Sequence, residues 1–142
     1  MDREEAWARL AAARVGYLAT VRPDGSPHIV VVTFAIVGGV IVTAIDHKPK
    51  TTERLQRLVN IEANPEVSLM ADHYAEDWDL LWWVRVDGHA QIHENQDAPP
   101  GSVAALVAKY PQYGARPPKG PVIAITVERV VSWDGGQKGS DD

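Results

Sequence analysis

Hydrophobic and polar residues follow two different periods along this chain. Residues 2–14 place apolar side chains at helical spacing, and Asp2 followed by Glu5 forms a capping box, so the chain is expected to open with an amphipathic helix. Three runs rich in β-branched residues, separated by Pro23-Asp24-Gly25 and Gly38-Gly39, predict strands at residues 17–21, 28–36 and 40–45. Together these three strands are expected to form an antiparallel meander.

A second helical pattern and three more strands complete the prediction. A helix is expected from about Thr51 to Ala63, where Asn64-Pro65 would end it. The remaining elements are strands at residues 67–71, 80–93 and 122–133 and a short helix at residues 102–109. Because the helices do not alternate with the strands, we expect a mainly β fold of the α+β class, a six-stranded antiparallel barrel with peripheral helices.

Length and composition limit the possible functions. The 142 residues predict one domain at 1–133 and a flexible polar tail at 134–142. A net charge of −5 argues against nucleic acid or an anionic membrane as a partner, and the absence of cysteine excludes disulfides and thiolate chemistry. The acidic start MDREEAW has no signal-peptide pattern, and Gly38-Gly39 interrupts the longest apolar run, so a cytoplasmic protein without a membrane span is expected.

A basic segment directly after the strand at 40–45 is the strongest candidate for chemistry. It contains His47, Lys48 and Lys50, followed by a possible helix cap at Thr51 and by Arg54 in the predicted first turn. Cations crowded at a helix N-terminus oppose the helix dipole, and a bound phosphate would take several donors there at once. The alternative is a turn whose lysine side chains are simply solvated.

Other catalytic and metal-binding patterns are missing. No HExxH, GxSxG, GxGxxG or GxxxxGK motif occurs among the 142 residues. Of the five histidines, His89 and His93 would lie about 13 Å apart on a strand, which is too far to share an ion. No metal site is therefore predicted, although ligands from distant segments could still converge.

Adjacent tryptophans on the predicted strand at 80–93 suggest a surface with two roles. Trp82 and Trp83 must point to opposite faces, so one would enter the barrel while the other meets a partner or ligand, and Arg85 shares the face of Trp83. Packing or a subunit interface is the simpler interpretation, because aromatic residues are enriched there.

The order of these segments resembles the pyridoxamine 5′-phosphate oxidase-like, FMN-binding split-barrel superfamily. The resemblance rests on the PDG turn, the strand GSPHIVVVTF, the strand VIVTAI, the segment HKPK and the later NPEVSL, and it extends over residues 17–88 and 122–133. It is closest to the actinobacterial branch of probable coenzyme F420-dependent enzymes. No single motif is diagnostic, but the ordered set is fairly specific.

The resemblance implies a six-stranded split β-barrel, an intertwined homodimer and two cofactor sites between the subunits. The cofactor ring would lie along Val32, Thr33, Thr43 and Ala44, its phosphate near Lys48, Lys50 and Thr51, and the second subunit would supply Trp82, Trp83 and Arg85. This chain has Val31-Val32-Thr33-Phe34 where many relatives have PVWF, which alters the surface under the ring.

The resulting functional hypothesis is a homodimeric oxidoreductase that uses the deazaflavin F420, or FMN, to transfer a hydride to a small organic substrate. His73 or Tyr74 would serve if an acid is required. The counterparts of the classical pyridoxamine oxidase substrate residues are missing, which disfavours that activity. Two alternatives stay open: a module that only binds a flavin, deazaflavin or haem, and an interaction domain with an empty groove.

Overall fold

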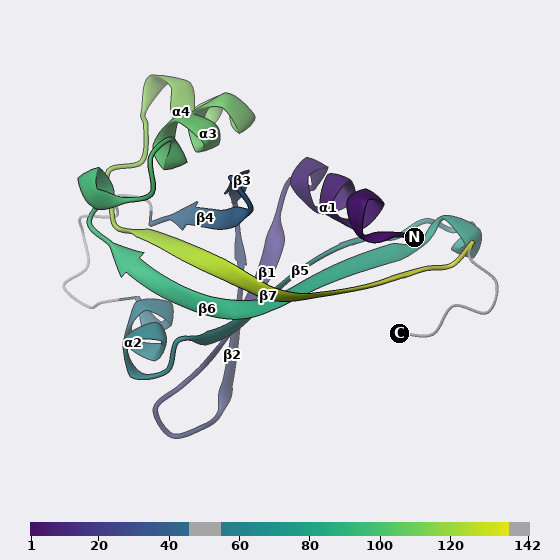
Figure 1. Cartoon of the computed structure of the whole chain (residues 1–142), viewed down its shortest axis with the longest axis horizontal. Coiled ribbons are helices and arrows are strands. Elements are labelled where there is room, and N and C mark those ends of the chain that lie inside the picture. The colour runs from purple at the N-terminus through teal and green to yellow at the C-terminus, as the bar shows by residue number, and fades with distance from the viewer. Residues whose placement is uncertain (46–54, 137–142) are drawn as a thin grey trace.

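The computed structural model describes residues 1–45 and 55–136, and its elements surround one curled sheet (Figure 1). In chain order they are α1 (Arg3–Ala12), β1 (Gly16–Val21), β2 (Pro27–Val32), β3 (Ala35–Val37), β4 (Val40–Ala44), α2 (Gln56–Ala63), β5 (Glu66–His73), the 3-10 turn η1 (Trp78–Leu80), β6 (Trp82–His93), η2 (Asn95–Asp97), α3 (Ser102–Lys109), α4 (Gln112–Ala115) and β7 (Val122–Asp134). No helix of the described residues is long and apolar enough to cross a membrane.

The sheet is antiparallel, and its two edge strands follow each other in the sequence. Its seven strands lie in the order β2-β1-β5-β6-β7-β4-β3. Only Thr33 and Phe34 separate the end of β2 from the start of β3, and three Cα–Cα steps span at most about 11 Å. The sheet must therefore curl until its edges meet at this corner, which produces an open barrel and agrees with the predicted fold class.

The predicted three-stranded meander is wrong, because the expected strand at 28–36 is broken in two. Its first part pairs with β1 as β2, and its second part pairs with β4 as β3, so that β2 and β4 lie far apart in the sheet order. At the break, the backbone N–H of Phe34 donates to the hydroxyl of Tyr110 at 3.1 Å instead of to a neighbouring strand. This break raises the count to seven strands from the predicted six.

The helices confirm the sequence prediction at two of three positions. The side chain of Asp2 accepts a hydrogen bond from the backbone N–H of Glu5 at 2.8 Å and begins α1, and α3 has the predicted bounds. The helix expected from Thr51 begins only at Gln56, because Leu55 has extended backbone angles. Residue 51 itself lies outside the described residues.

A buried polar contact holds α2 against the barrel. Asn60 is fully buried, and its amide donates to the hydroxyl of Thr20 on β1 at 2.9 Å. The side chain of Gln56 donates in turn to Asn60 at 2.7 Å. Since a buried amide without partners is costly, these bonds fix the register of the helix on the sheet.

Strand β4 is buried on both faces because it lies between two apolar clusters. Ile41 and Ile45 point into the barrel interior, whereas Val42 and Ala44 pack in a second cluster with Leu106 of α3. The near-continuous apolar run of this strand is the sequence signal of such double burial.

A β-bulge bends the long ribbon formed by β6 and β7. Asp87 pairs with Arg129 but Gly88 pairs with Val127, so Glu128 is the additional residue. A Cβ atom on Gly88 would overlap the carbonyl oxygen of Thr126. Glycine is therefore required here by the close approach of two backbones.

Replacing Gly88 with alanine should destabilise the barrel by about 2 kcal/mol or more, because an added methyl group forces the two strands apart. The free energy of unfolding from urea denaturation measures the effect. Gly114→Ala is the matched control, since a Cβ atom there meets nothing within 4 Å and the backbone is not left-handed. Equal stability of the two variants would contradict this role of the bulge.

Candidate functional site

The outer face of the sheet is the most unusual surface of the described chain. Two rows of laterally paired residues cross it: Val31, Tyr17, Met70, Arg85 and Val131 in one, and Ile29, Ala19, Ser68, Asp87 and Arg129 in the other. Ile29 and Val31 are 65% and 60% exposed, which is high for β-branched residues on a strand. An apolar sheet face of this kind marks an interaction surface.

A polar cluster centred on Asp87 interrupts this face. Its carboxylate accepts hydrogen bonds from Ser68 at 2.7 Å, from Arg85 at 3.0 Å and from Arg129 at 2.9 Å. Burial acts to raise the pKa of Asp87, but the bonds from Ser68, Arg129 and Arg85 outweigh it and lower the pKa below its usual value. This cluster lines a groove of about 520 Å³ together with Glu66, so two guanidinium groups and two carboxylates surround it.

Trp82 and Trp83, both predicted to line the site, point to opposite faces of β6, because neighbouring residues on a strand alternate between faces. Trp82 packs against the barrel core, stacks on His73 with ring centroids 6.2 Å apart, and carries the guanidinium of Arg9 at 5.6 Å from its ring. Trp83 pairs laterally with Trp133 and shares the outer face with Arg85. The structure therefore brings Trp83 and Arg85 together and separates them from Trp82.

The two candidate acids lie near the far end of the same ribbon. His73 ends β5 and pairs with Trp82, and the neighbouring Tyr74 is 64% exposed. Near them the exposed Trp78 and Leu80 project from η1. Trp78 and Leu80 therefore form an apolar tip, which adds to the apolar area that Ile29 and Val31 expose on the sheet.

The residues predicted to lie along the cofactor ring differ in their accessibility. Val32, Thr43 and Ala44 are no more than 6% exposed, because their side chains fill the core, whereas Thr33 at the corner is partly exposed and its hydroxyl lies 2.9 Å from that of Tyr113. Their assignment to a cofactor stays a prediction. The residues predicted to bind the phosphate lie outside the described residues; they are His47, Lys48, Lys50, Thr51 and Arg54.

A groove of about 660 Å³ lies between α2 and β6. Leu58, Ile61 and Ile92 line it together with Pro121. The backbone N–H of Ile45 donates to the carbonyl of Pro121 at 2.8 Å, so Ile45 lies beside this groove.

The two halves of the predicted site lie at opposite ends of β7. Ala44 pairs with Val122 at the start of β7, whereas Trp82 pairs with Asp134 at its end. Twelve residues at about 3.3 Å each separate these points by up to about 40 Å. The two groups of predicted site residues therefore lie toward opposite ends of the ribbon formed by β6 and β7.

One protein-family model matches most of this chain. The family model described as pyridoxamine 5′-phosphate oxidase matches residues 3–134. The chain belongs to the pyridoxamine 5′-phosphate oxidase family. The fold of this family is associated with flavin oxidoreductases and with flavin- and haem-binding proteins. A comparison with curated proteins finds no match.

Solved structures support the same fold for this family member. A conserved hypothetical protein from Mycobacterium tuberculosis is 26% identical, with a TM-score of 0.79, over 100% of this chain and 90% of its own. A haem-binding protein from Mycobacterium smegmatis is 23% identical, with a TM-score of 0.76, over 98% of this chain and 55% of its own. A FAD-binding protein from Mesorhizobium loti is 20% identical, with a TM-score of 0.70, over 93% of this chain and 94% of its own.

This member of the pyridoxamine 5′-phosphate oxidase family also contains a cationic cluster that the sequence analysis missed. The Nζ atom of Lys109 is buried without a hydrogen-bond partner and lies 4.0 Å from the ring centroid of Phe34. Arg14 lies over the ring of Tyr110 at 4.8 Å and donates to the carbonyl of Lys109 at 2.8 Å. In the sequence this cluster is indicated only by a lysine close to two tyrosines, in the run Lys109-Tyr110-Pro111-Gln112-Tyr113.

A second missed cluster joins three strands on the sheet. The two ring nitrogens of His89 contact the carboxylates of Glu66 and Glu128, the residue that the bulge adds. Because the carboxylates approach different ring nitrogens, the arrangement suits a histidine hydrogen-bonded between two acids better than one metal ion. Sequence spacing could not reveal it, since the bulge changes which residues face each other.

Stability should depend on pH through Lys109. Burial, with a smaller contribution from the charge of Arg14, lowers the pKa of Lys109 from 10.5 to about 8. Between these values the unfolded chain binds more protons than the folded one, so the unfolding free energy should rise as the pH increases from about 8 toward 10.5. Burial also raises the pKa of Tyr110, which therefore stays neutral over most of this range.

Lys109→Met should remove that rise and should stabilise the protein most at pH 7, where the wild-type ammonium is charged. Thermal unfolding followed by circular dichroism at several pH values between 7 and 10 measures it. The exposed Lys119 provides the control, because Lys119→Met should leave the pH profile unchanged. Parallel profiles for the wild type and Lys109→Met would show that Lys109 does not cause the dependence.

Proposed function

We propose that this protein is a homodimeric F420-dependent oxidoreductase whose two cofactor sites lie between the subunits. The reduced deazaflavin would supply the hydride, and a small organic molecule would accept it. Thr33 and the strands beside it would line one side of the ring, and the basic residues after β4 would bind the phosphate. Trp83 and Arg85 of the second subunit would form the opposite wall.

The observation that carries this proposal is the separation of the two halves of the predicted site. The strand that leads into the basic segment pairs with the start of β7, and the tryptophans lie toward its end. In a single copy the two groups lie up to about 40 Å apart along the ribbon, and we infer that each forms only half of a site. A second copy related by two-fold symmetry completes both sites at once, since an isologous interface repeats every contact.

The outer sheet face supplies a surface suited to this dimer. Its apolar rows around Ile29 and Val31 are exposed in the single chain, and the cluster at Asp87 provides polar groups at the centre. Interfaces commonly combine apolar contact area with a few satisfied charged groups. The tip at Trp78 and Leu80 would reach toward the partner's cofactor groove.

A proton donor for the transfer would come from the same end of the ribbon. His73 is held by its stack on Trp82, and the exposed Tyr74 follows it. Both are hypotheses for a group that protonates the reduced product. Cofactor binding does not depend on either.

Substituting Val31 with glutamate should disrupt the dimer without unfolding the chain. The side chain is exposed in one copy, so the charge is solvated there, whereas a symmetric interface would bury two unpaired charges. A cost of a few kcal/mol corresponds to about a hundredfold weaker association or more. Sedimentation velocity measures it, with Ala104→Glu on the exposed face of α3 as the control. An unchanged dimer would exclude this face as the interface.

Mixed dimers test whether each site uses both subunits. Trp83→Ala alone and Lys48→Ala with Lys50→Ala should each lose F420 affinity, because each homodimer lacks one half of both sites. Co-expression of the two variants with different tags yields a mixed dimer in which one site has both halves intact. Its F420 titration, followed by tryptophan fluorescence, should recover half of the wild-type stoichiometry.

The same titration separates the remaining interpretations. No recovery in the mixed dimer would mean that one chain supplies a whole site and would reject the shared-site proposal. Tighter binding of FMN than of F420 would make FMN, and not F420, the cofactor of this protein. Stoichiometric cofactor binding without reduction of any acceptor in a broad panel would make the protein a binding module.

A further inference from the structure

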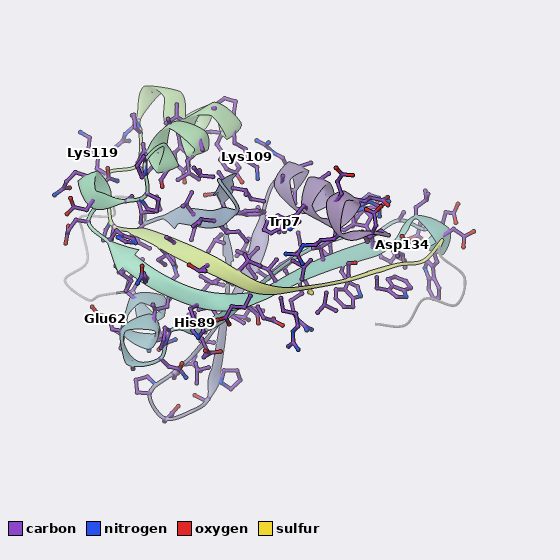
Figure 2. All side chains as sticks on the ribbon, in the orientation of Figure 1. Trp7, Glu62, His89, Lys109, Lys119 and Asp134 are labelled. Carbon is purple, nitrogen blue, oxygen red and sulfur yellow. The ribbon has the colours of Figure 1, made fainter. Side chains whose placement is uncertain are left out.

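A pocket on the helical side of the barrel shares only Thr33 with the residues that the cofactor proposal uses. It has a volume of about 380 Å³ and is lined by Arg14, Thr33, Tyr110, Gln112 and Tyr113. This volume is in the range of small-molecule sites, which start at roughly 300 Å³. In Figure 2 the labelled Lys109, which directly precedes the lining residue Tyr110, lies between α1 and the α3–α4 pair.

The pocket lies beside two cations that no carboxylate neutralises. Within residues 1–45 and 55–136, neither Arg14 nor Lys109 forms an ion pair, although the chain as a whole carries a charge of −5. The Nζ of Lys109 lies 4.0 Å from the ring centroid of Phe34 and 5.4 Å from that of Tyr110, and it has no hydrogen-bond partner among the described residues. A buried ammonium without a hydrogen-bond partner is costly, so it requires a compensating contact.

The pocket walls are rigid and mainly aromatic. Tyr110 and Tyr113 meet edge to face with their ring centroids 5.8 Å apart. The hydroxyl of Tyr110 is held by the backbone of the corner, and that of Tyr113 bonds Thr33 at 2.9 Å. Among the described residues the guanidinium of Arg14 makes one hydrogen bond, to the carbonyl of Lys109, although a guanidinium has five N–H donors. Aromatic surfaces beside spare donors fit a flat anionic ligand.

We propose that this pocket binds a small aromatic carboxylate. The guanidinium of Arg14 would bind the carboxylate, the rings of Tyr110 and Tyr113 would contact the aromatic part, and Lys109 would add positive charge from behind. A monoanion suits the site better than a phosphate, because the hydroxyl and amide donors around Arg14 are too few for a phosphate's oxygens. All five lining residues come from one chain, and Thr33 is the one that the cofactor proposal also uses.

Isothermal titration of the purified full-length protein with benzoate tests this proposal, with benzamide as the neutral analogue. Benzoate should bind and benzamide should bind about tenfold more weakly or worse, because a hydrogen bond to a charged group is worth more than a neutral one. Arg14→Gln should reduce benzoate affinity about tenfold or more. Tyr113→Phe should reduce it several-fold while retaining the ring. Arg116→Gln, at an exposed position outside the pocket lining, should leave the affinity unchanged.

The competing outcomes are distinct. Equal binding of benzoate and benzamide, or benzoate affinity that Arg14→Gln and Tyr113→Phe both leave unchanged, would overturn the carboxylate assignment. Tighter binding of inorganic phosphate than of benzoate would overturn the ligand class. If Arg14→Gln lowers the melting temperature, Arg14→Lys replaces it as the test, because lysine keeps the positive charge. Weaker benzoate binding by Arg14→Lys at wild-type stability would support the role of the two-pronged guanidinium group. Failure of F420 binding in the mixed dimers would leave this result unaffected.

Discussion

The hydrogen bonds of one tyrosine hydroxyl determine the topology of this protein. The hydroxyl of Tyr110 accepts from the backbone N–H of Phe34 at 3.1 Å and lies within donating distance of the carbonyls of Phe34 at 3.0 Å and Arg14 at 2.9 Å. These bonds satisfy the buried backbone N–H and carbonyl of Phe34, which would otherwise have to pair with another strand. The chain can therefore leave one sheet edge at Val32 and begin the opposite edge at Ala35.

Both functional proposals depend on this corner. It leaves Thr33 partly exposed between β2 and β3, and it brings the end of α1 and the end of α3 together around Tyr110. It also places β4 beside β7, so that the strand leading to the basic segment lies far from the outward-facing Trp83 and Arg85. The requirement for a second subunit in the cofactor proposal is a consequence of that separation.

Local patterns predicted the elements better than their pairing. The bounds of α3, the cap at Asp2 and the opposite orientation of Trp82 and Trp83 follow from neighbouring residues, which a sequence displays directly. The break at Phe34 depends on a hydroxyl 76 residues away, and the cluster at His89 depends on the bulge residue Glu128. The residues Lys109 and Arg14 are 95 positions apart, so no spacing could have connected them. The predicted ring and phosphate residues stay predictions, since Thr43 and Ala44 are buried and Lys48 and Lys50 lie outside the described residues.

The position of β7 has a consequence for the order in which the protein can fold. This strand is the last of the described strands, yet it lies between β6 and β4 and pairs with both. During synthesis, each of those strands keeps an unpaired edge until residues 122–134 have left the ribosome. Such edges are templates for association with other chains. The nascent protein is therefore most vulnerable to aggregation just before its final strand arrives, and closure of the barrel is a late, long-range event.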